Sequence, residues 1–243
     1  MLLSLLLAIP ASAASFSDAE KLFRAGQIAE AQALAAAEVE RGIWNRSWWQ
    51  LLIECQMATG QYADALETYD AASKRYPTSV PLRRIGVGVA HFNGQPQRAK
   101  REAEVIENYL QSGQLAYANA ETLIAAGRYF SKGILDARII LKSFYDRVLE
   151  NDPDNVEALI ATAELALDKG DFRIASETVF NAKRLELSDA RFDYLLARSL
   201  LNSDRPKAIQ ALNTALIGNP TYEPALLLQA EMEIDRERFS DAE

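Results

Sequence analysis

Apolar residues recur along most of this chain at spacings of three and four, the period that places them on one face of an α-helix. Residues 46–79 show the pattern in two halves. The apolar positions there are Trp49, Leu52, Ile53, Met57, Ala65, Leu66, Tyr69 and Ala72. Gly60 separates the two halves, and Pro77 follows the second. Because glycine and proline interrupt helices, the pattern predicts two amphipathic helices joined by a short turn.

A glycine–glutamine pair recurs every 34 residues in the first half of the chain. The stretches are GQIAEAQ from Gly26, GQYADAL from Gly60 and GQPQRAK from Gly94, and an alanine follows each glycine by five residues. We expect each glycine to adopt a positive φ in the turn, which lets the second helix run back antiparallel to the first. The alanine is expected where the helices cross most closely, because a larger side chain there would push them apart.

The same alanine position can be followed along the whole sequence. It falls on Ala31, Ala65, Ala99, Leu141, Ala175, Ala208 and Ala242, with Leu141 as a poor substitute. Repeats of this length indicate a solenoid, in which each unit buries its apolar face against its neighbours. The predicted units are 14–45, 46–79, 80–113, 114–155, 156–189, 190–222 and a truncated 223–243. The fourth unit holds about eight extra residues, expected as longer helices or as a loop near residues 131–133.

These units resemble the tetratricopeptide repeat family, whose repeat of about 34 residues carries Trp, Leu-Gly, Tyr, Ala, Phe and Pro at fixed positions. In the second unit the matching residues are Trp49, Leu52, Tyr62, Ala65, Tyr69, Ala72 and Pro77. In the fifth unit they are Ala163, Gly170, Phe172, Ala175 and Ala182. The resemblance implies an all-α fold, a right-handed α-solenoid of about seven helix-turn-helix repeats with a concave groove.

Residues 1–13, MLLSLLLAIPASA, have the features of a secretory signal peptide, with an apolar run before a proline and an A-x-A cleavage motif. We expect cleavage after Ala13 and export of residues 14–243 to the periplasm or the extracellular space. No later segment is apolar enough to predict a membrane span after signal removal. Ser17 and Glu20 form a predicted capping box for the first helix. The last residues match the start of a second helix and then stop, which predicts that the natural protein continues.

Composition narrows the possible functions. The chain has 243 residues, 49% of them hydrophobic, which supports a folded core. Its net charge of −8 argues against a nucleic-acid partner, which requires Lys and Arg to displace phosphate counterions. A single histidine, His91, excludes a metal site built on two histidines, and the single cysteine, Cys55, is expected to be buried. We therefore expect no catalytic residue, cofactor or metal within these residues.

Side chains of the first helix in each unit are expected to line the groove near positions two, five, nine and twelve. This rule selects as candidate peptide-binding residues Arg84, His91, Glu157, Glu164, Arg191, Tyr194 and Arg198. Arg191, Tyr194 and Arg198 share one helical stripe, which suits a peptide carboxylate or an aromatic ring. The alternative is a solvated face whose charges pair locally. Some family members clamp a C-terminal carboxylate with Lys and Asn, and this sequence has other residues at those positions.

Two functions remain open at this point. The sequence favours an exported, non-catalytic scaffold that binds a protein or peptide partner along its groove. The alternative is the N-terminal interaction module of a larger exported enzyme. The chain is similar to bacterial exported proteins in which such repeats precede a zinc-dependent peptidase-like domain, so the resemblance implies that such a domain follows residue 243.

Overall fold

The computed structural model describes residues 15–183, 185 and 189–235, and it contains no strand within those ranges. The α-helices are α1 (Phe16–Arg24), α2 (Ile28–Glu40), α3 (Arg46–Ala58), α4 (Tyr62–Arg75), α5 (Val80–Phe92), α6 (Pro96–Gln111), α7 (Ala120–Phe130), α8 (Ala137–Ile140), α9 (Asp146–Asn151), α10 (Val156–Asp168), α11 (Phe172–Lys183), α12 (Ala190–Leu200), α13 (Arg205–Gly218) and α14 (Glu223–Ile234). Two further segments are a 3₁₀ turn, η1 (Gln114–Tyr117), and a π-helical turn, η2 (Leu141–Tyr145). None of the helices in the described ranges is long and apolar enough to cross a bilayer.

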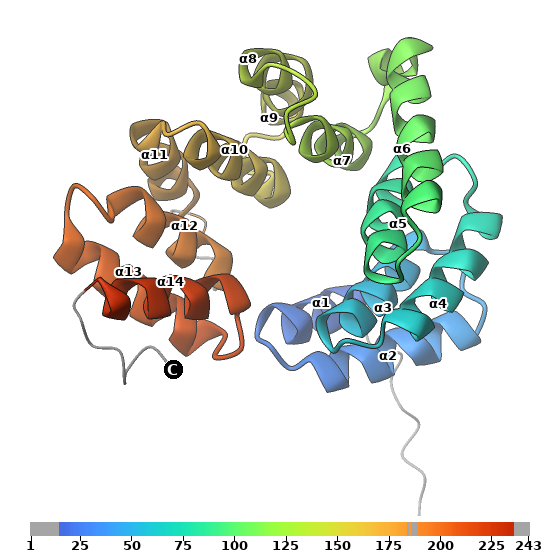
Figure 1. Cartoon of the computed structure of the whole chain (residues 1–243), viewed down its shortest axis with the longest axis horizontal. Coiled ribbons are helices and arrows are strands. Elements are labelled where there is room, and N and C mark those ends of the chain that lie inside the picture. Colours follow the sequence, from blue (N-terminus) through green and yellow to red (C-terminus); the bar gives the residue numbers. More distant parts are fainter. Residues whose placement is uncertain (1–14, 184, 186–188, 236–243) are drawn as a thin grey trace, which may run out of the picture.

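The helices pair in chain order, and the pairs stack into a curved solenoid (Figure 1). α1 pairs with α2, α3 with α4, α5 with α6, α10 with α11 and α12 with α13. α8, η2 and α9 form one continuous segment that pairs with α7. The first helix of each pair, together with α14, faces the inside of the curve, and the second helices form the outside. The predicted all-α solenoid is therefore confirmed.

Short polar residues start the first helices by accepting a hydrogen bond from a backbone N–H of the first turn. These N-caps are Ser15, Asn45, Ser79, Asn119, Asn155 and Asp189. Ser15 caps α1 by accepting from the Asp18 N–H at 3.1 Å, so the prediction that Ser17 is the N-cap is wrong. The same S-x-x-[DE] pattern occurs two residues earlier with Asp18 in the acidic position, and the Ser15 hydroxyl also donates to that carboxylate.

The turn glycines behave as expected. Gly60 has a φ of +74°, and the N–H of the next residue, Gln61, donates to the Gln56 carbonyl at 2.8 Å. Gly26 and Gly94 also have positive φ and are followed by the same hydrogen bond. This pattern closes the end of the first helix and reverses the chain direction within a few residues.

The crossing alanines are buried at the fourth residue of each second helix. They are Ala31, Ala65, Ala99, Ala175 and Ala208, all at most 2% exposed. In the fourth pair this place belongs to Ile140, which is fully buried, and Leu141 is only partly buried. The predicted equivalence of Leu141 is therefore one residue out of register. The last predicted position, Ala242, lies outside the described residues.

The extra residues of the fourth unit lie mainly at two places. Residues 112–119 connect α6 to α7 through η1, and residues 131–136 connect α7 to α8. The π-helical turn η2 inserts one extra residue into the continuous segment formed by α8, η2 and α9. Tyr145 of η2 therefore lies five residues after the crossing residue Ile140, whereas Tyr69 of α4 lies four residues after Ala65. Both tyrosines are nevertheless fully buried.

Two tyrosines pack against glycines of first helices. Around Gly86 of α5 an added Cβ would overlap the Tyr69 ring, with Cε2 only 2.6 Å away, whereas around Gly88 nothing lies within 4 Å. Tyr145 packs in the same way on Gly127 of α7. Glycine at these places allows a close approach of neighbouring helices that any side chain would prevent.

The two ends of the described solenoid meet. The Asn219 side chain donates at 3.0 Å to the carbonyl of Arg24, the last residue of α1, and also accepts from the Thr221 N–H at 3.0 Å. Asn219 follows α13, so this contact joins the first helix pair to the last units across 195 residues. Gly26 fits directly against it, because an added Cβ would overlap Asn219 Oδ1 and lie 2.6 Å from Thr221 Oγ1.

Replacing Gly86 with alanine should lower the free energy of unfolding by about 1–3 kcal/mol, because the methyl group overlaps a fully buried tyrosine. The matched change Gly88→Ala should leave stability unchanged or raise it by up to about 1 kcal/mol, since alanine favours the helix. Urea unfolding of both variants measures the difference. Equal effects would contradict the packing described for Gly86.

Replacing Gly26 with alanine should open the arc. Gly60→Ala is the matched control. Both glycines have a φ near +75°, so alanine at either position costs roughly 1–2 kcal/mol of backbone strain. Only at Gly60 does an added Cβ have nothing within 4 Å. Small-angle X-ray scattering should show a larger radius of gyration for Gly26→Ala than for Gly60→Ala. An unchanged radius for both would argue against the end-to-end contact.

Candidate functional site

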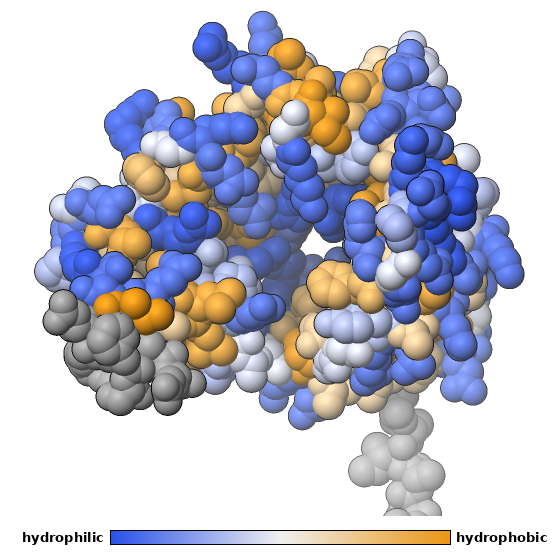
Figure 2. Space-filling view, viewed as in Figure 1, coloured by the Kyte–Doolittle hydropathy of each residue, from blue (hydrophilic) through white to orange (hydrophobic). Residues whose placement is uncertain are grey.

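The curve of the solenoid encloses a cavity of about 950 Å³. Its lining comes from the first helices α1, α3, α5, α7 and from residues at the start of α10, α12 and α14. Figure 2 shows an opening in the middle of the curve with hydrophilic residues around it. Apolar lining residues include Leu51, Pro81, Ile124 and Ala125. The cavity therefore combines an apolar surface with charged side chains.

A smaller cavity of about 510 Å³ adjoins the first. Arg84, Arg128, Arg191, Tyr222 and Pro224 line both of them. The smaller cavity extends between α7, α10 and α12. The two cavities thus form one continuous site on the inner face of the solenoid.

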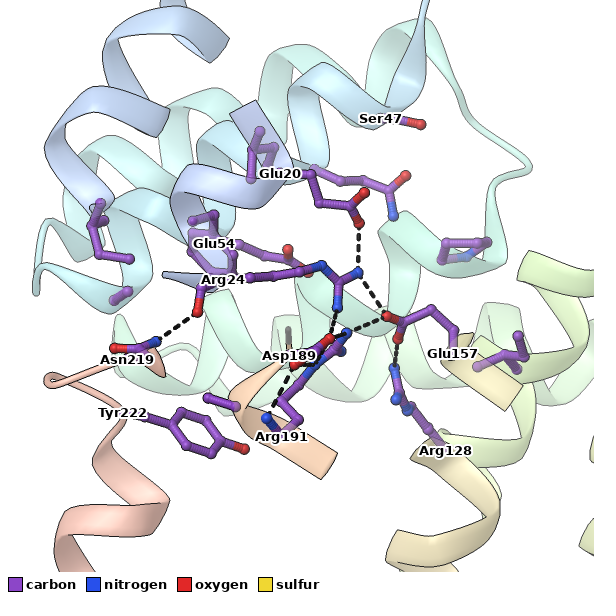
Figure 3. Close-up of a pocket in the computed structure, with 18 of the residues that line it drawn as sticks. Glu20, Arg24, Ser47, Glu54, Arg128, Glu157, Asp189, Arg191, Asn219 and Tyr222 are labelled. Carbon is purple, nitrogen blue, oxygen red and sulfur yellow. Dashed lines mark hydrogen bonds and ion pairs between the residues drawn. The ribbon is translucent and has the colours of Figure 1, made fainter. Parts of the chain in front are cut away.

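A network of ion pairs crosses the larger cavity (Figure 3). The Arg24 guanidinium contacts Asp189 at 2.5 Å, Glu157 at 2.9 Å and Glu20 at 2.6 Å. These contacts connect the last turn of α1 to the starts of α10 and α12. Burial disfavours the charge of Arg24, but Glu157 and Asp189 outweigh it and raise the pKa of Arg24 above its usual range.

Glu157 is the centre of this network. It accepts from Arg24 at 2.9 Å, from Arg191 at 2.8 Å and from Arg128 at 3.1 Å. Burial opposes its charge, but Arg128 and Arg24 lower the pKa of Glu157 below its usual value. Asp189 is only 6% exposed in its side chain, and burial raises its pKa despite the contact with Arg24. Removal of one of these arginines would leave Glu157 and Asp189 with fewer charge partners in a partly buried site.

Two charged residues in the larger cavity differ from this network. Glu54 of α3 and Arg84 of α5 take part in none of the hydrogen bonds or close ion pairs found among the described residues, although both are partly buried. Burial raises the pKa of Glu54, and nearby Arg84 opposes the shift. Burial lowers the pKa of Arg84, and the like charge of Arg128 lowers it further. Their polar atoms are available to a ligand.

The structure brings six of the seven predicted groove residues to these cavities. Arg84 and Arg191 line both, Glu157 lines the larger one, and Glu164, Tyr194 and Arg198 line the smaller one. His91 is exposed near the end of α5, two turns beyond Arg84, and lines neither. The predicted stripe on α12 is divided in its contacts. Arg191 pairs with Glu157 and Asp189, whereas Arg198 lies over the Tyr194 ring at 6.0 Å.

The charged residues of the site that the groove prediction did not select include Arg24, Glu54, Arg128 and Asp189. Glu54 is the ninth residue of the predicted second unit, so the position rule, applied to that unit, would have selected it. Arg128 is the ninth residue of α7, but the predicted fourth unit begins at residue 114, six residues before that helix, so the rule misses it. Arg24 and Asp189 join the site only because α1 approaches α10 and α12, and no local pattern in the sequence indicates that approach.

The lining of the larger cavity provides guanidinium, carboxylate, hydroxyl and apolar groups. Among its described lining residues there is no histidine or cysteine, and the hydroxyl groups of Ser47, Thr221 and Tyr222 have no imidazole or thiol beside them. The described part of the chain also holds no group of three His, Cys, Asp or Glu residues placed to bind a metal ion. The arrangement suits ligand contacts through arginine, carboxylate and apolar side chains.

No protein-family model matches the chain, and no curated protein matches it by sequence. Solved structures match its shape. A tetratricopeptide repeat protein from Parabacteroides merdae aligns with a TM-score of 0.56 and 12% identity, over 93% of this chain and 87% of that one. A human IFIT1 dimer with PPP-AAAA aligns with a TM-score of 0.61 and 12% identity, over 90% of this chain and 53% of that one.

The Cut9–Hcn1 hetero-tetramer of the APC/C aligns with a TM-score of 0.52 and 12% identity, over 90% of this chain and 49% of that one. The present chain thus spans about half the length of the matched IFIT1 and Cut9–Hcn1 chains. Identities this low concern the fold and not the ligand. The structural alignments, together with the paired helices, positive-φ turn glycines and buried crossing alanines, show that this chain has the fold of a tetratricopeptide-repeat solenoid.

Proposed function

We propose that this chain is a non-catalytic scaffold that binds a peptide segment of a partner protein in the cavity enclosed by its first helices. The observation that carries the proposal is the cavity of about 950 Å³, to which every helix pair and the start of α14 contribute lining residues. Stacked helix pairs produce such concave binding surfaces through their regular curvature.

The chemistry of the lining supports a peptide ligand. Apolar residues such as Leu51 and Ile124 can contact aliphatic side chains, while Glu54 and Arg84 have free acceptors and donors for polar groups. Binding sites commonly combine an apolar surface with a few convergent polar groups. The lack of histidine and cysteine among the described lining residues also favours binding over catalysis. One solved structure of this fold, Cut9–Hcn1, is itself a complex between two proteins.

Placing a bulky side chain in the cavity should weaken peptide binding. Ala58 at the end of α3 is exposed and lines the cavity, so Ala58→Trp would place an indole ring inside it. Ala63→Trp is the matched control, because Ala63 is equally an exposed helical alanine but lines neither cavity. Peptides selected from a random display library on the wild-type protein should bind Ala58→Trp at least about tenfold more weakly, a loss of 1.4 kcal/mol or more.

Isothermal titration calorimetry with one selected peptide measures both variants. Equal weakening in the two variants, or full binding by Ala58→Trp, would contradict the proposed binding site. A wild-type selection that enriches no peptide sequence would contradict the proposed function itself.

We also propose that the chain is exported and that residues 1–13 are removed. These residues lie outside the described part of the chain, so the support is their sequence alone: an apolar run, a proline and the A-x-A motif. Expressed in a bacterial host, the protein should appear in the periplasmic fraction with Ala14 as its first residue. Mass spectrometry of the purified chain checks this, and an intact leader on a cytoplasmic product would contradict it.

A further inference from the structure

The smaller cavity has an excess of positive charge, unlike the larger one. Five cationic side chains line it, and only two carboxylates, Glu164 and Asp168, accompany them. The cationic residues are Arg84, Arg128, Lys132, Arg191 and Arg198. Since the whole chain carries a net charge of −8, this local excess runs against the average of the protein. Arg128 and Arg191 are also paired with Glu157 and Asp189 of the larger cavity, so the attraction for an anionic group comes mainly from Arg84, Lys132 and Arg198.

Arg84 is the arginine of this site that has carboxylates in its vicinity, Glu54, Glu164 and Glu157, but forms no close ion pair with any of them. Arg128 contacts Glu157 at 3.1 Å and Glu164 at 3.3 Å, and Arg191 contacts carboxylates at 2.6 and 2.8 Å. None of the close ion pairs among the described residues involves Arg84. A guanidinium withdrawn from bulk water without an acceptor has lost hydrogen bonds that a ligand can restore.

The Tyr145 hydroxyl is a second unsatisfied donor in the same cavity. The Tyr145 side chain is fully buried, it is one of the lining residues, and its hydroxyl has no hydrogen-bond partner. The ring is held in place by its packing on Gly127. Buried hydroxyl groups in native proteins are usually paired, so one that lines a basic cavity without a partner points to a missing acceptor.

We propose that the smaller cavity is an anion subsite that binds a carboxylate or phosphoryl group of the partner peptide through Arg84 and the Tyr145 hydroxyl. This inference rests on the proposed peptide-binding function and adds the chemistry of the ligand. A carboxylate and a phosphoryl group each carry several acceptor lone pairs. One such anion can therefore accept hydrogen bonds from two donors on different helices. Lys132 and Arg198 are exposed at the same cavity and attract the anion without being required to contact it.

The test uses inorganic phosphate and three capped pentapeptides, in which glutamate, phosphoserine or glutamine is flanked by alanines. Calorimetry should show binding of phosphate, of the glutamate peptide or of the phosphoserine peptide, and much weaker binding of the glutamine peptide. The stronger of the two anionic peptides identifies the source of the anion. Arg84→Gln should weaken that binding by roughly 10- to 100-fold, as expected for a charge-assisted hydrogen bond.

Two further variants separate binding from folding. Tyr145→Phe removes only a hydroxyl that has no partner in the free protein, so the melting temperature should not fall while anion binding weakens severalfold. Arg173→Gln is the charge-matched control, because Arg173 lies on α11 outside both cavities and pairs with Glu177 on the surface. It should leave binding unchanged.

The outcomes distinguish the two proposals. If the glutamine peptide binds as well as the charged ones, or if Arg84→Gln and Arg173→Gln have equal effects, the anion subsite is wrong while peptide binding stands. If phosphate binds in an Arg84-dependent way but neither these peptides nor any library peptide does, the subsite stands and the peptide scaffold is wrong. If no probe binds, the subsite is wrong.

Discussion

The whole architecture depends on how closely the two helices of each pair approach. An alanine or its equivalent occupies the crossing point in every second helix, and a left-handed glycine often forms the turn before it. Where the crossing residue is alanine, the two helices can approach closely, and each pair turns relative to the one before it. The curvature that encloses the cavity is the sum of these small rotations. In the fourth pair the larger Ile140 occupies the crossing point, and this is also the unit with longer connections and the π-helical turn η2.

Sequence patterns predicted the parts of this structure that repeat. The turn glycines, the crossing alanines and six residues of the inner face follow from a fixed spacing, because helix geometry is local. The fourth unit departs from that spacing, and Ile140 rather than Leu141 takes the crossing position because η2 inserts one residue later in the same helix. The meeting of Arg24 with Asp189 depends on the accumulated curvature of all the units between them. No short stretch of sequence encodes such a sum.

The charges of the inner face have two different roles. Glu157 contacts three arginines from α1, α7 and α12, and Glu20, Glu164 and Asp189 help to compensate their charge. The same residues had been candidates for ligand contact, and the structure shows that Glu157 and Arg191 already satisfy one another. Arg84 comes from α5 and makes no direct contact with Glu157, so its hydrogen-bond donors remain open to another group. A polar side chain that the internal ion pairs and hydrogen bonds leave without a partner can thus indicate a ligand site.

The contact between Asn219 and the carbonyl of Arg24 changes how this solenoid should respond to damage. In an open array, each repeat depends only on its neighbours, and the stabilities of the repeats add along the chain. Here the first pair also depends on the last units, which makes the array partly circular. The loss of either end therefore removes support from the other, and melting should be more cooperative than a row of independent neighbours allows.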